Sequence, residues 1–354
     1  MFAILKRELK NYLKNPLFWA GVALVVLGVF QTVSPYLGTR YLSPGEEIIN
    51  DYPEAVHDGE VYEGYVPSTE EQRREIWEKS VQENLVSKVG MDKEAAKAAV
   101  DSMKEMDITQ ACKYLEEVYH YSWAIYAYED AAYHKGTWEE INSYLAGELE
   151  NRPFSYYFSR KFADFAGLFM GFFAAVTLSV LYMQDTRKNT YELLHTKPVS
   201  AAKYIAGKAG GGFGICLIVL AILNLVFWIL CSICTKSSGF EVRLSDFVTA
   251  TFLYILPNML MIVSIYGVIS LIFKNPLPAT PLLILYMVYS NMGGRNAEGN
   301  YGYYGRPLAI MVRFPGPLFD TSPPPMALFN QCFLVLASVG ILLISIQLWK
   351  RRRI

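Results

Sequence analysis

Residues that could carry chemistry are sparse in this 354-residue chain, and the nearest approach to a nucleotide site is the stretch AKYIAGKA at 202–209. A phosphate-binding loop needs glycine at its first position, and a serine or threonine after its lysine to hold magnesium. Here Ala202 and Ala209 occupy those two positions. The sequence also lacks a nucleophile elbow and a His-Glu-x-x-His zinc motif. We therefore expect no catalytic residue and no nucleotide-binding site in this sequence.

Metal and redox sites are disfavoured by the spacing of the possible ligands. Cys231 and Cys234 form a C-x-x-C pair, but they end an apolar run and have no further ligands nearby. Packing cysteines explain that pattern better than a metal or redox site does. His57, His120 and His134 have no metal-ligand spacing with one another. We expect neither a metal nor another cofactor in this chain.

Charged residues are divided unevenly along the chain, which is 53% hydrophobic and 18% charged. Residues 41–161 hold 25 of the 33 acidic residues and 12 of the 32 basic ones, so the remainder is basic. The basic residues of the remainder border apolar runs, as they do at the cytosolic edge of a membrane protein. They do not interleave with aromatic residues on one face, which argues against nucleic-acid binding. The pattern predicts an acidic aqueous domain and a membrane domain.

Six apolar runs are candidates for membrane spans. They cover residues 17–37, 162–183, 209–234, 247–273 with a kink at Pro257, 277–292, which is short, and 326–349. Residues 1–15 alternate apolar and basic positions, which predicts an amphipathic helix in the inner headgroup layer. The lysine and arginine residues between the spans place both termini in the cytosol. The fold class we expect is an all-α polytopic membrane protein.

Residues 41–161 should form a mainly helical extracellular domain between the first two spans, dividing the chain into 1–40, 41–161 and 162–354. Capping signals at 68–71, at Asp92 and at 137–140 mark helix starts. The predicted helices run from there to about 89, to about 106, from about 108 to 135, and from 137 onward.

An aromatic stripe follows the third of these helices. Its members at helical spacing are Leu115, Tyr119, Ser122 and Tyr126, with Trp123 and Tyr133 nearby. Such a stripe is more often core packing than a ligand-binding surface. The alternative is that these residues recognise a substrate or a partner outside the membrane.

The polar segment at 184–208, QDTRKNTYELLHTKPVSAAKYIAGK, lies between two long apolar runs. Its five basic residues outnumber its two acidic ones, which places it in the cytosol. Pro198 disfavours helix at the residue before it, and Ser200 can cap a new helix that enters the membrane. We therefore predict a short helix, a corner, and a membrane helix attached rigidly to that corner.

The order of residues in this segment resembles that of ABC-2 type transporter permeases. The landmarks are Asp185, Asn189-Thr190, Glu192, Leu193-Leu194, Thr196, Pro198-Val199-Ser200, Tyr204 and Gly207-Lys208. Asn189 stands where the family usually has glycine, a mild departure because both residues tolerate a left-handed turn. The helix at 1–15 also resembles the family's N-terminal elbow helix, and residues 293–325 resemble its outer re-entrant segment in position.

The resemblance implies the permease subunit of an ATP-driven exporter in the plasma membrane. In that family the loop between the second and third spans docks, as a coupling helix, on a separate ATP-binding subunit, which would hold ATP and magnesium. The residues expected to contact it are Asp185, Thr190, Glu192, Leu193, Leu194, Thr196 and Pro198. A second permease subunit, identical or related, would flank the path among membrane lipids. Candidate substrates are peptides, antibiotics, lipids and glycans.

Polar residues in the predicted spans are candidates for that path. Asn224, Asn258 and Asn291 could line it, or could instead hydrogen-bond neighbouring helices. Asp164 has no partner charge in the neighbouring spans, so we expect it to be solvated at the outer end of its span. Residues 293–325, rich in Gly, Tyr and Pro, cannot face lipid, and only 308–312 is apolar enough to dip back. They form either an extracellular lid or a passive loop.

Two other functions compete with the permease. A polytopic receptor or scaffold would bind a ligand with its acidic outer domain and signal to a cytosolic protein through residues 184–208. A secondary transporter fits less well, because the sequence shows neither buried charges nor an inverted repeat.

Overall fold

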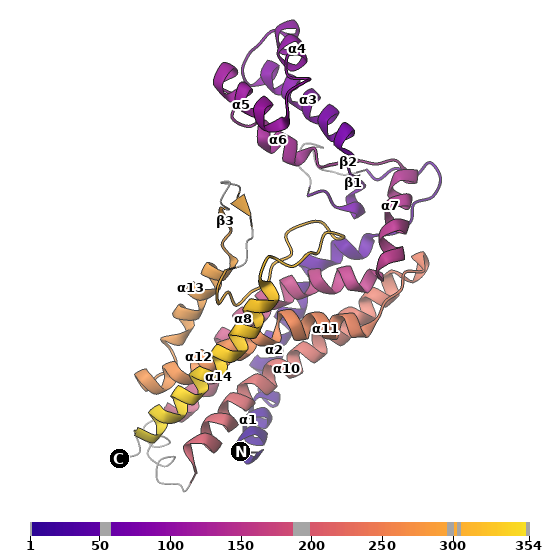
Figure 1. Ribbon diagram of the computed structural model, residues 1–354. Helices are drawn as coiled ribbons and strands as arrows, with labels where there is room; N and C mark the ends of the chain where they lie inside the picture. Colours follow the sequence, from indigo (N-terminus) through magenta and orange to yellow (C-terminus); the bar gives the residue numbers. More distant parts are fainter. Residues whose placement is uncertain (1, 50–57, 187–198, 296–300, 303–305, 352–354) are drawn as a thin grey trace. The chain divides into compact units, whose positions relative to one another are not determined.

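The computed structural model describes residues 2–49, 58–186, 199–295, 301–302 and 306–351, which are mostly helical (Figure 1). The chain forms two compact units. Unit 1 contains Met1–Gly38 and Leu149–Ile354, and unit 2 contains Thr39–Glu148.

Unit 2 is mainly helical, as the sequence predicts. Its elements are η2 (Val61–Glu63), β1 (Tyr65–Pro67), α3 (Glu70–Ser87), α4 (Lys93–Asp101), α5 (Ile108–Tyr119), α6 (Ala124–Asp130), β2 (Tyr133–Lys135) and the start of α7 (Trp138–Asn151). The two short strands pair antiparallel, with Tyr65 opposite Lys135. The bundle α3–α6 therefore begins and ends at one small sheet.

The predicted helix starts are confirmed in unit 2, with one change of partner. Thr69 is the N-cap of α3, and Gln72 rather than an acidic residue completes its capping box. Asp92 accepts a hydrogen bond from the N–H of Glu94 at 3.1 Å. The Thr137–Glu140 box is formed by bonds of 2.8 and 3.3 Å. Each cap satisfies backbone N–H groups that have no partner within the helix.

The prediction of one helix from 108 to 135 is wrong. His120 adopts a left-handed conformation, φ 54°, and ends α5. The N–H groups of His120 and Tyr121 then bond to the carbonyls of Glu116 and Leu115, a helix-ending pattern that needs no glycine when the residue tolerates positive φ. The chain turns, forms the short α6 and enters β2. Helix α4 also ends earlier than predicted, at Asp101.

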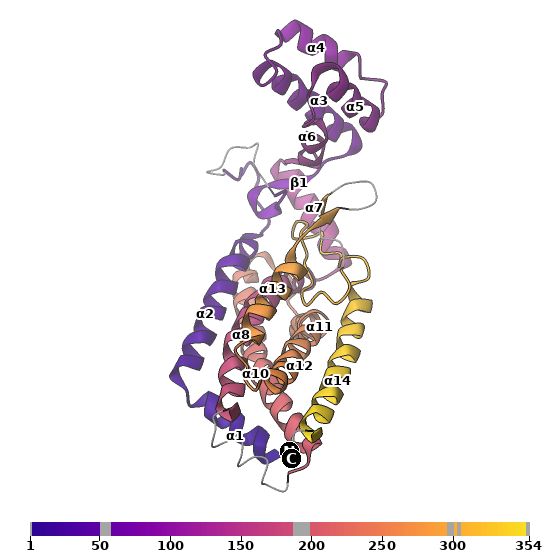
Figure 2. The ribbon, with the colours of Figure 1, turned by 90° about the vertical axis from the view of Figure 1, so that its left-hand side faces the viewer.

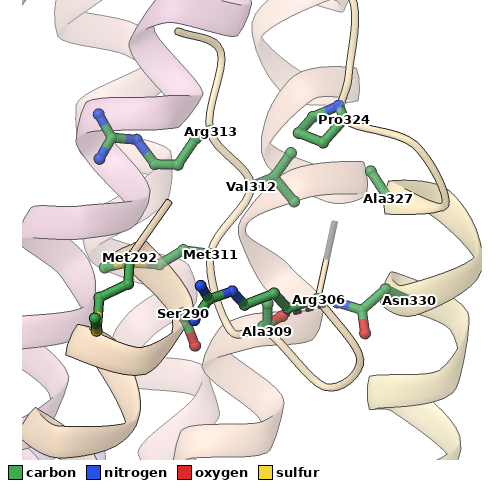
Figure 3. Close-up of a pocket in the computed structure, with 10 residues that line it drawn as sticks. All are labelled: Ser290, Met292, Arg306, Ala309, Met311, Val312, Arg313, Pro324, Ala327 and Asn330. Atoms are coloured by element: carbon green, nitrogen blue, oxygen red, sulfur yellow. Dashed lines mark hydrogen bonds between the residues drawn. The ribbon is translucent and has the colours of Figure 1, made fainter. Parts of the chain in front are cut away.

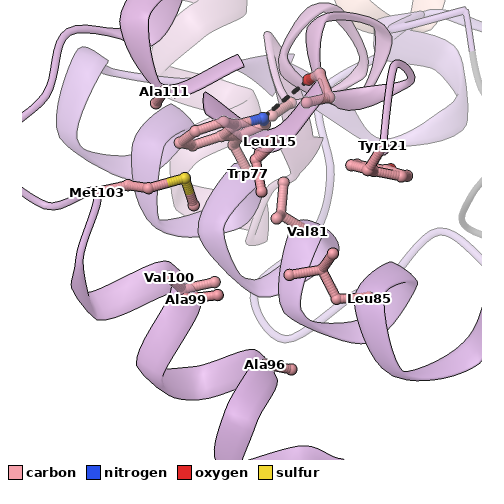
Figure 4. Packing of buried hydrophobic residues seen from close by; sticks show 12 residues of the cluster. Trp77, Val81, Leu85, Ala96, Ala99, Val100, Met103, Ala111, Leu115 and Tyr121 are labelled. Atoms are coloured by element: carbon pink, nitrogen blue, oxygen red, sulfur yellow. Dashed lines mark hydrogen bonds between the residues drawn. The ribbon is translucent and has the colours of Figure 1, made fainter. Parts of the chain in front are cut away.

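The core of unit 2 is built around Trp77, which is fully buried together with Val81, Leu85 and Leu115 (Figure 4). The indole Nε1 of Trp77 donates to the carbonyl of Ala124 at 2.9 Å. This bond fixes α6 against α3 and gives the buried indole N–H an acceptor.

Trp77→Ala should destabilise unit 2 by about 3–5 kcal/mol, because it removes a large buried side chain and leaves the Ala124 carbonyl unpaired. Hydrogen exchange of α3 and α6 in the full-length protein would measure the loss. Trp123→Ala is the matched control, since Trp123 is 63% exposed and its loss should cost about 0.5 kcal/mol or less. Equal protection in the two variants would contradict this account of the core.

Unit 1 contains the apolar helices. Its elements are α1 (Phe2–Leu13), α2 (Pro16–Val33), η1 (Ser34–Gly38), α8 (Phe154–Thr186), α10 (Ala201–Cys234), η3 (Lys236–Ser238), α11 (Leu244–Tyr254), α12 (Leu256–Phe273), α13 (Ala279–Asn291), β3 (Gly294–Arg295), β4 (Tyr301–Gly302) and α14 (Ala327–Arg351). Across this unit α2 packs on α8, α8 on α12, and α12 on α14 (Figure 2). Helix α1 packs on α10.

Five stretches are long and apolar enough to cross a membrane: Phe18–Gly38, Phe154–Met183, Ala201–Cys234, Leu244–Phe273 and Ala327–Arg351. The fourth is broken between α11 and α12, where Pro257 occupies the first turn of α12, so the predicted kink is confirmed. The remaining predicted span is α13, whose 13 residues extend about 20 Å at 1.5 Å per residue. That is shorter than a hydrocarbon layer of about 30 Å, so a sixth span stays a prediction.

Glycines on α10 allow two helices to approach it closely. A Cβ atom added at Gly211 would lie 3.1 Å from Cβ of Glu8 on α1, and one added at Gly212 would lie 2.8 Å from Cδ2 of Leu178 on α8. Larger residues at these positions would push α1 or α8 away. The predicted helix at 1–15 therefore forms as α1 and is packed against protein along part of its length.

Candidate functional site

Of the predicted docking segment, residues 184–208, the structure describes only 184–186 and 199–208. Asp185 belongs to the last turn of α8, whereas Thr190, Glu192, Leu193, Leu194, Thr196 and Pro198 lie outside the described residues. The end of α8, the start of α10 and both chain termini lie at the same end of unit 1 (Figure 1). Helices α8 and α10 therefore flank the predicted docking segment and support its two ends.

Helix α10 begins where the sequence predicts. Ser200 is its N-cap, with extended backbone (φ −68°, ψ 145°), and its hydroxyl accepts from the N–H of Lys203 at 3.4 Å. The helix that enters the membrane thus begins inside the predicted docking segment 184–208, at Ala201.

A buried ion pair ties the start of α10 to α1. The Nζ atom of Lys208 lies 3.1 Å from Oε1 of Glu8, and the two side chains are only 2% and 7% exposed. The same Nζ lies 5.8 Å from the ring centroid of Tyr182 on α8. Lys208, one of the five basic residues of segment 184–208, is therefore buried, and a lysine in the interior needs a paired carboxylate. One ammonium group joins three helices.

The first turns of α10 are also attached to the end of α14. The rings of Tyr204 and Trp349 are stacked, with centroids 4.0 Å apart, and both residues are buried. Leu271 of α12 belongs to the same cluster. Because α1, α8, α12 and α14 all contact this part of α10, a displacement of its first turns would be transmitted to the packed helices.

Lys208→Met should lower stability by about 3–5 kcal/mol, because the Glu8 carboxylate is left buried without its partner. The double variant Glu8→Leu, Lys208→Met should recover most of that loss. Thermal unfolding in detergent micelles would compare them, with Lys203→Met, exposed one turn earlier, as the near-neutral control. A double variant less stable than Lys208→Met would show that the pair is not the dominant interaction here.

The three predicted path residues are not brought together. Asn224 donates to the carbonyl of Leu220 at 2.7 Å and to Oγ1 of Thr251 at 2.9 Å. Asn258 donates to the Tyr254 carbonyl, which the break before α12 leaves without its usual helical partner. These hydrogen bonds are the kind expected under the second alternative, contact between helices, and a role in lining a path stays a prediction. Asn291 accepts from the guanidinium of Arg313.

The expectation that Asp164 is solvated is wrong. Asp164 is buried and forms an ion pair with Arg313, while its Oδ2 accepts from the N–H of Phe314 at 2.8 Å. Nearby on α8, Nζ of Lys161 donates to the carbonyls of Phe314, at 3.0 Å, and Gly316. The partner charge comes from the Gly- and Pro-rich segment between α13 and α14, not from a span, which is why inspection of the spans missed it.

Side chains from α13 and α14 hold the same segment from the other side (Figure 3). Asn330 donates to the carbonyl of Ala309 at 2.8 Å, and the N–H of Ile310 donates to Oγ of Ser290 at 3.0 Å. Residues 309–312 are buried against protein, and whether the apolar piece 308–312 dips back into the membrane stays a prediction. Its non-helical backbone is tolerated because protein groups satisfy it. The cavity beside it measures about 30 Å³, too small for a transported molecule.

Asp164→Asn should loosen residues 306–326, because Arg313 loses its countercharge. With the five native cysteines replaced by alanine, a cysteine at Val312, which is buried, should react with maleimide about tenfold faster in this variant. Asp320→Asn, at an exposed carboxylate of the same segment, should leave the rate unchanged. Unaltered labelling in Asp164→Asn would mean that the ion pair does not hold the segment.

The residues of the aromatic stripe in unit 2 differ in burial, so core packing, one of its two interpretations, applies to only some of them. Leu115 is fully buried in the core, whereas Trp123 and Tyr126 are 63% and 55% exposed. The turn at His120 causes this division, because it breaks the helix that would have kept them on one face. Within the ranges that the structure describes, no three His, Cys, Asp or Glu side chains gather as metal ligands.

Comparison with known proteins finds one relationship. A family model described as "ABC-2 family transporter protein" matches residues 2–303. Neither a curated protein nor a solved structure matches the chain.

Proposed function

Because the chain belongs to the ABC-2 transporter family, and is thus a multi-pass membrane permease of an ABC transporter, we propose that it exports its substrate with energy from a separate ATP-binding subunit. The family match over residues 2–303 carries this proposal. The alanines at 202 and 209, where a phosphate-binding loop needs glycine and serine or threonine, support a source of energy in the partner.

The partner would dock on residues 184–208. In this proposal the residues that contact the ATP-binding subunit are Asp185, Thr190, Glu192, Leu193, Leu194, Thr196 and Pro198. The excess of basic residues in this segment supports a cytosolic position, with both termini on the same side and unit 2 outside. A second permease subunit, identical or related, would complete the path.

Two described contacts support transmission of force from the docking segment. Lys208 joins α10 to α8 beside Tyr182, and Asp164 near the start of α8 holds residues 313–314. Tyr182 and Asp164 are 18 residues apart on one helix, about 27 Å at 1.5 Å per residue. A tilt of α10 would therefore move α8 as a rod, and the rod would displace the segment between α13 and α14.

The double variant Glu192→Lys, Leu194→Asp should abolish copurification of the ATP-binding subunit, because it reverses a charge and puts a carboxylate into an apolar contact. The same pair of changes can be made at Glu116→Lys and Val118→Asp, both exposed on α5, as the matched control.

The control should retain the ATP-binding subunit and normal expression. Copurification that survives in Glu192→Lys, Leu194→Asp would remove residues 184–208 as the docking site. Loss in both double variants would indicate general misfolding, and would be traced by the thermal unfolding of each.

A further inference from the structure

Unit 2 has a groove between α3 and α6 that the transport proposal does not use. Its volume is about 300 Å³, at the lower end of the range of small-ligand sites. Ser80 and Asn84 line it from one face of α3, and Trp123, Tyr126 and Asp130 line it from the region of α6. All of these residues lie within unit 2.

Two exposed aromatic rings form a corner of this groove. Trp123 and Tyr126 have ring centroids 5.5 Å apart and planes inclined at 46°. They belong to no core, since the buried cluster of this unit is built on Trp77, Leu85 and Leu115. Neighbouring aromatic faces in water attract apolar groups and, through their negative π faces, the cations of lysine and arginine.

The electrostatic environment of the groove favours cations. The acidic region at 41–161 has about twice as many acidic as basic residues, so its field concentrates cations and repels anions. Asp130 contributes a carboxylate to the lining and has no ion-pair partner among the residues that the structure describes. Lys88, at the C-cap of α3, is the one basic side chain in the lining.

The polar wall distinguishes between kinds of cation. An amide N–H of Asn84 donates to Oγ of Ser80 at 3.4 Å. The Ser80 hydroxyl hydrogen, the second amide N–H and the amide carbonyl of these two side chains match the donors and acceptors of a peptide backbone. A simple polyamine would use only the acceptors.

We propose that this groove binds cationic amphipathic peptides. A basic side chain lies over Trp123 and Tyr126 near Asp130, and apolar side chains pack against the remaining lining. Binding here does not require that the peptide be transported.

The test uses the purified full chain in maltoside micelles and fluorescein-labelled hexapeptides. One probe alternates lysine with leucine, and the other alternates glutamate with leucine. Fluorescence anisotropy should show saturable binding of the lysine probe and none of the glutamate probe. Neither measurement involves ATP or a partner, so failure of this proposal is separable from failure of the transport proposal.

Matched variants locate the binding. Trp123→Ala should weaken the lysine probe about fivefold, as expected for loss of a cation–π contact, and Ile125→Ala, outside the lining, should not. Asp130→Asn should weaken it about threefold at low salt, and its neighbour Glu129→Gln should have a smaller effect. Lys88→Gln should strengthen binding, because it removes the opposing charge.

Three results would overturn the inference. The first is equal binding of the lysine and glutamate probes. The second is lysine-probe binding that is unaffected by Trp123→Ala, or affected equally by Ile125→Ala, since the groove would then not be the site. The third is Trp123-dependent binding of a neutral oligosaccharide in place of the peptide, which would assign the aromatic corner to another class of ligand.

Discussion

Buried ion pairs organise unit 1, because a charged side chain away from water needs a partner of opposite charge. Lys208 and Glu8 meet at one end of it, and Asp164 and Arg313 meet toward the other. In each pair one partner lies on a long apolar helix, and the other lies on α1 or on the segment between α13 and α14. Separating either pair would expose a charge to low dielectric at a cost of several kcal/mol. The pairs therefore specify where these two elements are attached.

The parts of this arrangement that depend on local signals could be predicted from the sequence. Ser200 marks the start of α10, Pro257 marks the break before α12, and long apolar runs mark the spans, because caps, prolines and hydrophobic length act within a few residues. Ion-pair partners 149 and 200 residues apart in the chain could not be found in this way. Glu8 is the lone acid of a basic helix, and Arg313 is one of three arginines in a Gly- and Pro-rich stretch. These features were the available signals, but neither names its partner.

The helix expected over 108–135 shows that local signals can favour an element that the tertiary structure interrupts. Its propensity and periodicity are adequate, yet His120 takes the left-handed conformation that closes α5. The gain is tertiary, because the turn lets α6 pack against Trp77 and form the bond to the Ala124 carbonyl. The same turn leaves Trp123 and Tyr126 on the surface. A single backbone reversal thus separates the residues of one sequence pattern into a core and a groove.

The small clasp formed by β1 and β2 has a consequence for how unit 2 could arise and change. Ser68 bonds to the carbonyl of Ala132 at 2.9 Å, and Tyr65 pairs with Lys135. The polypeptide thus leaves the sheet at β1 and returns to it at β2, at neighbouring points. The four helices α3 to α6 therefore form one insertion between two paired strands. Recombination could exchange such an insertion for a different one at little topological cost, since its two junctions are already adjacent. Related permeases could then differ in this unit while keeping the apolar helices of unit 1.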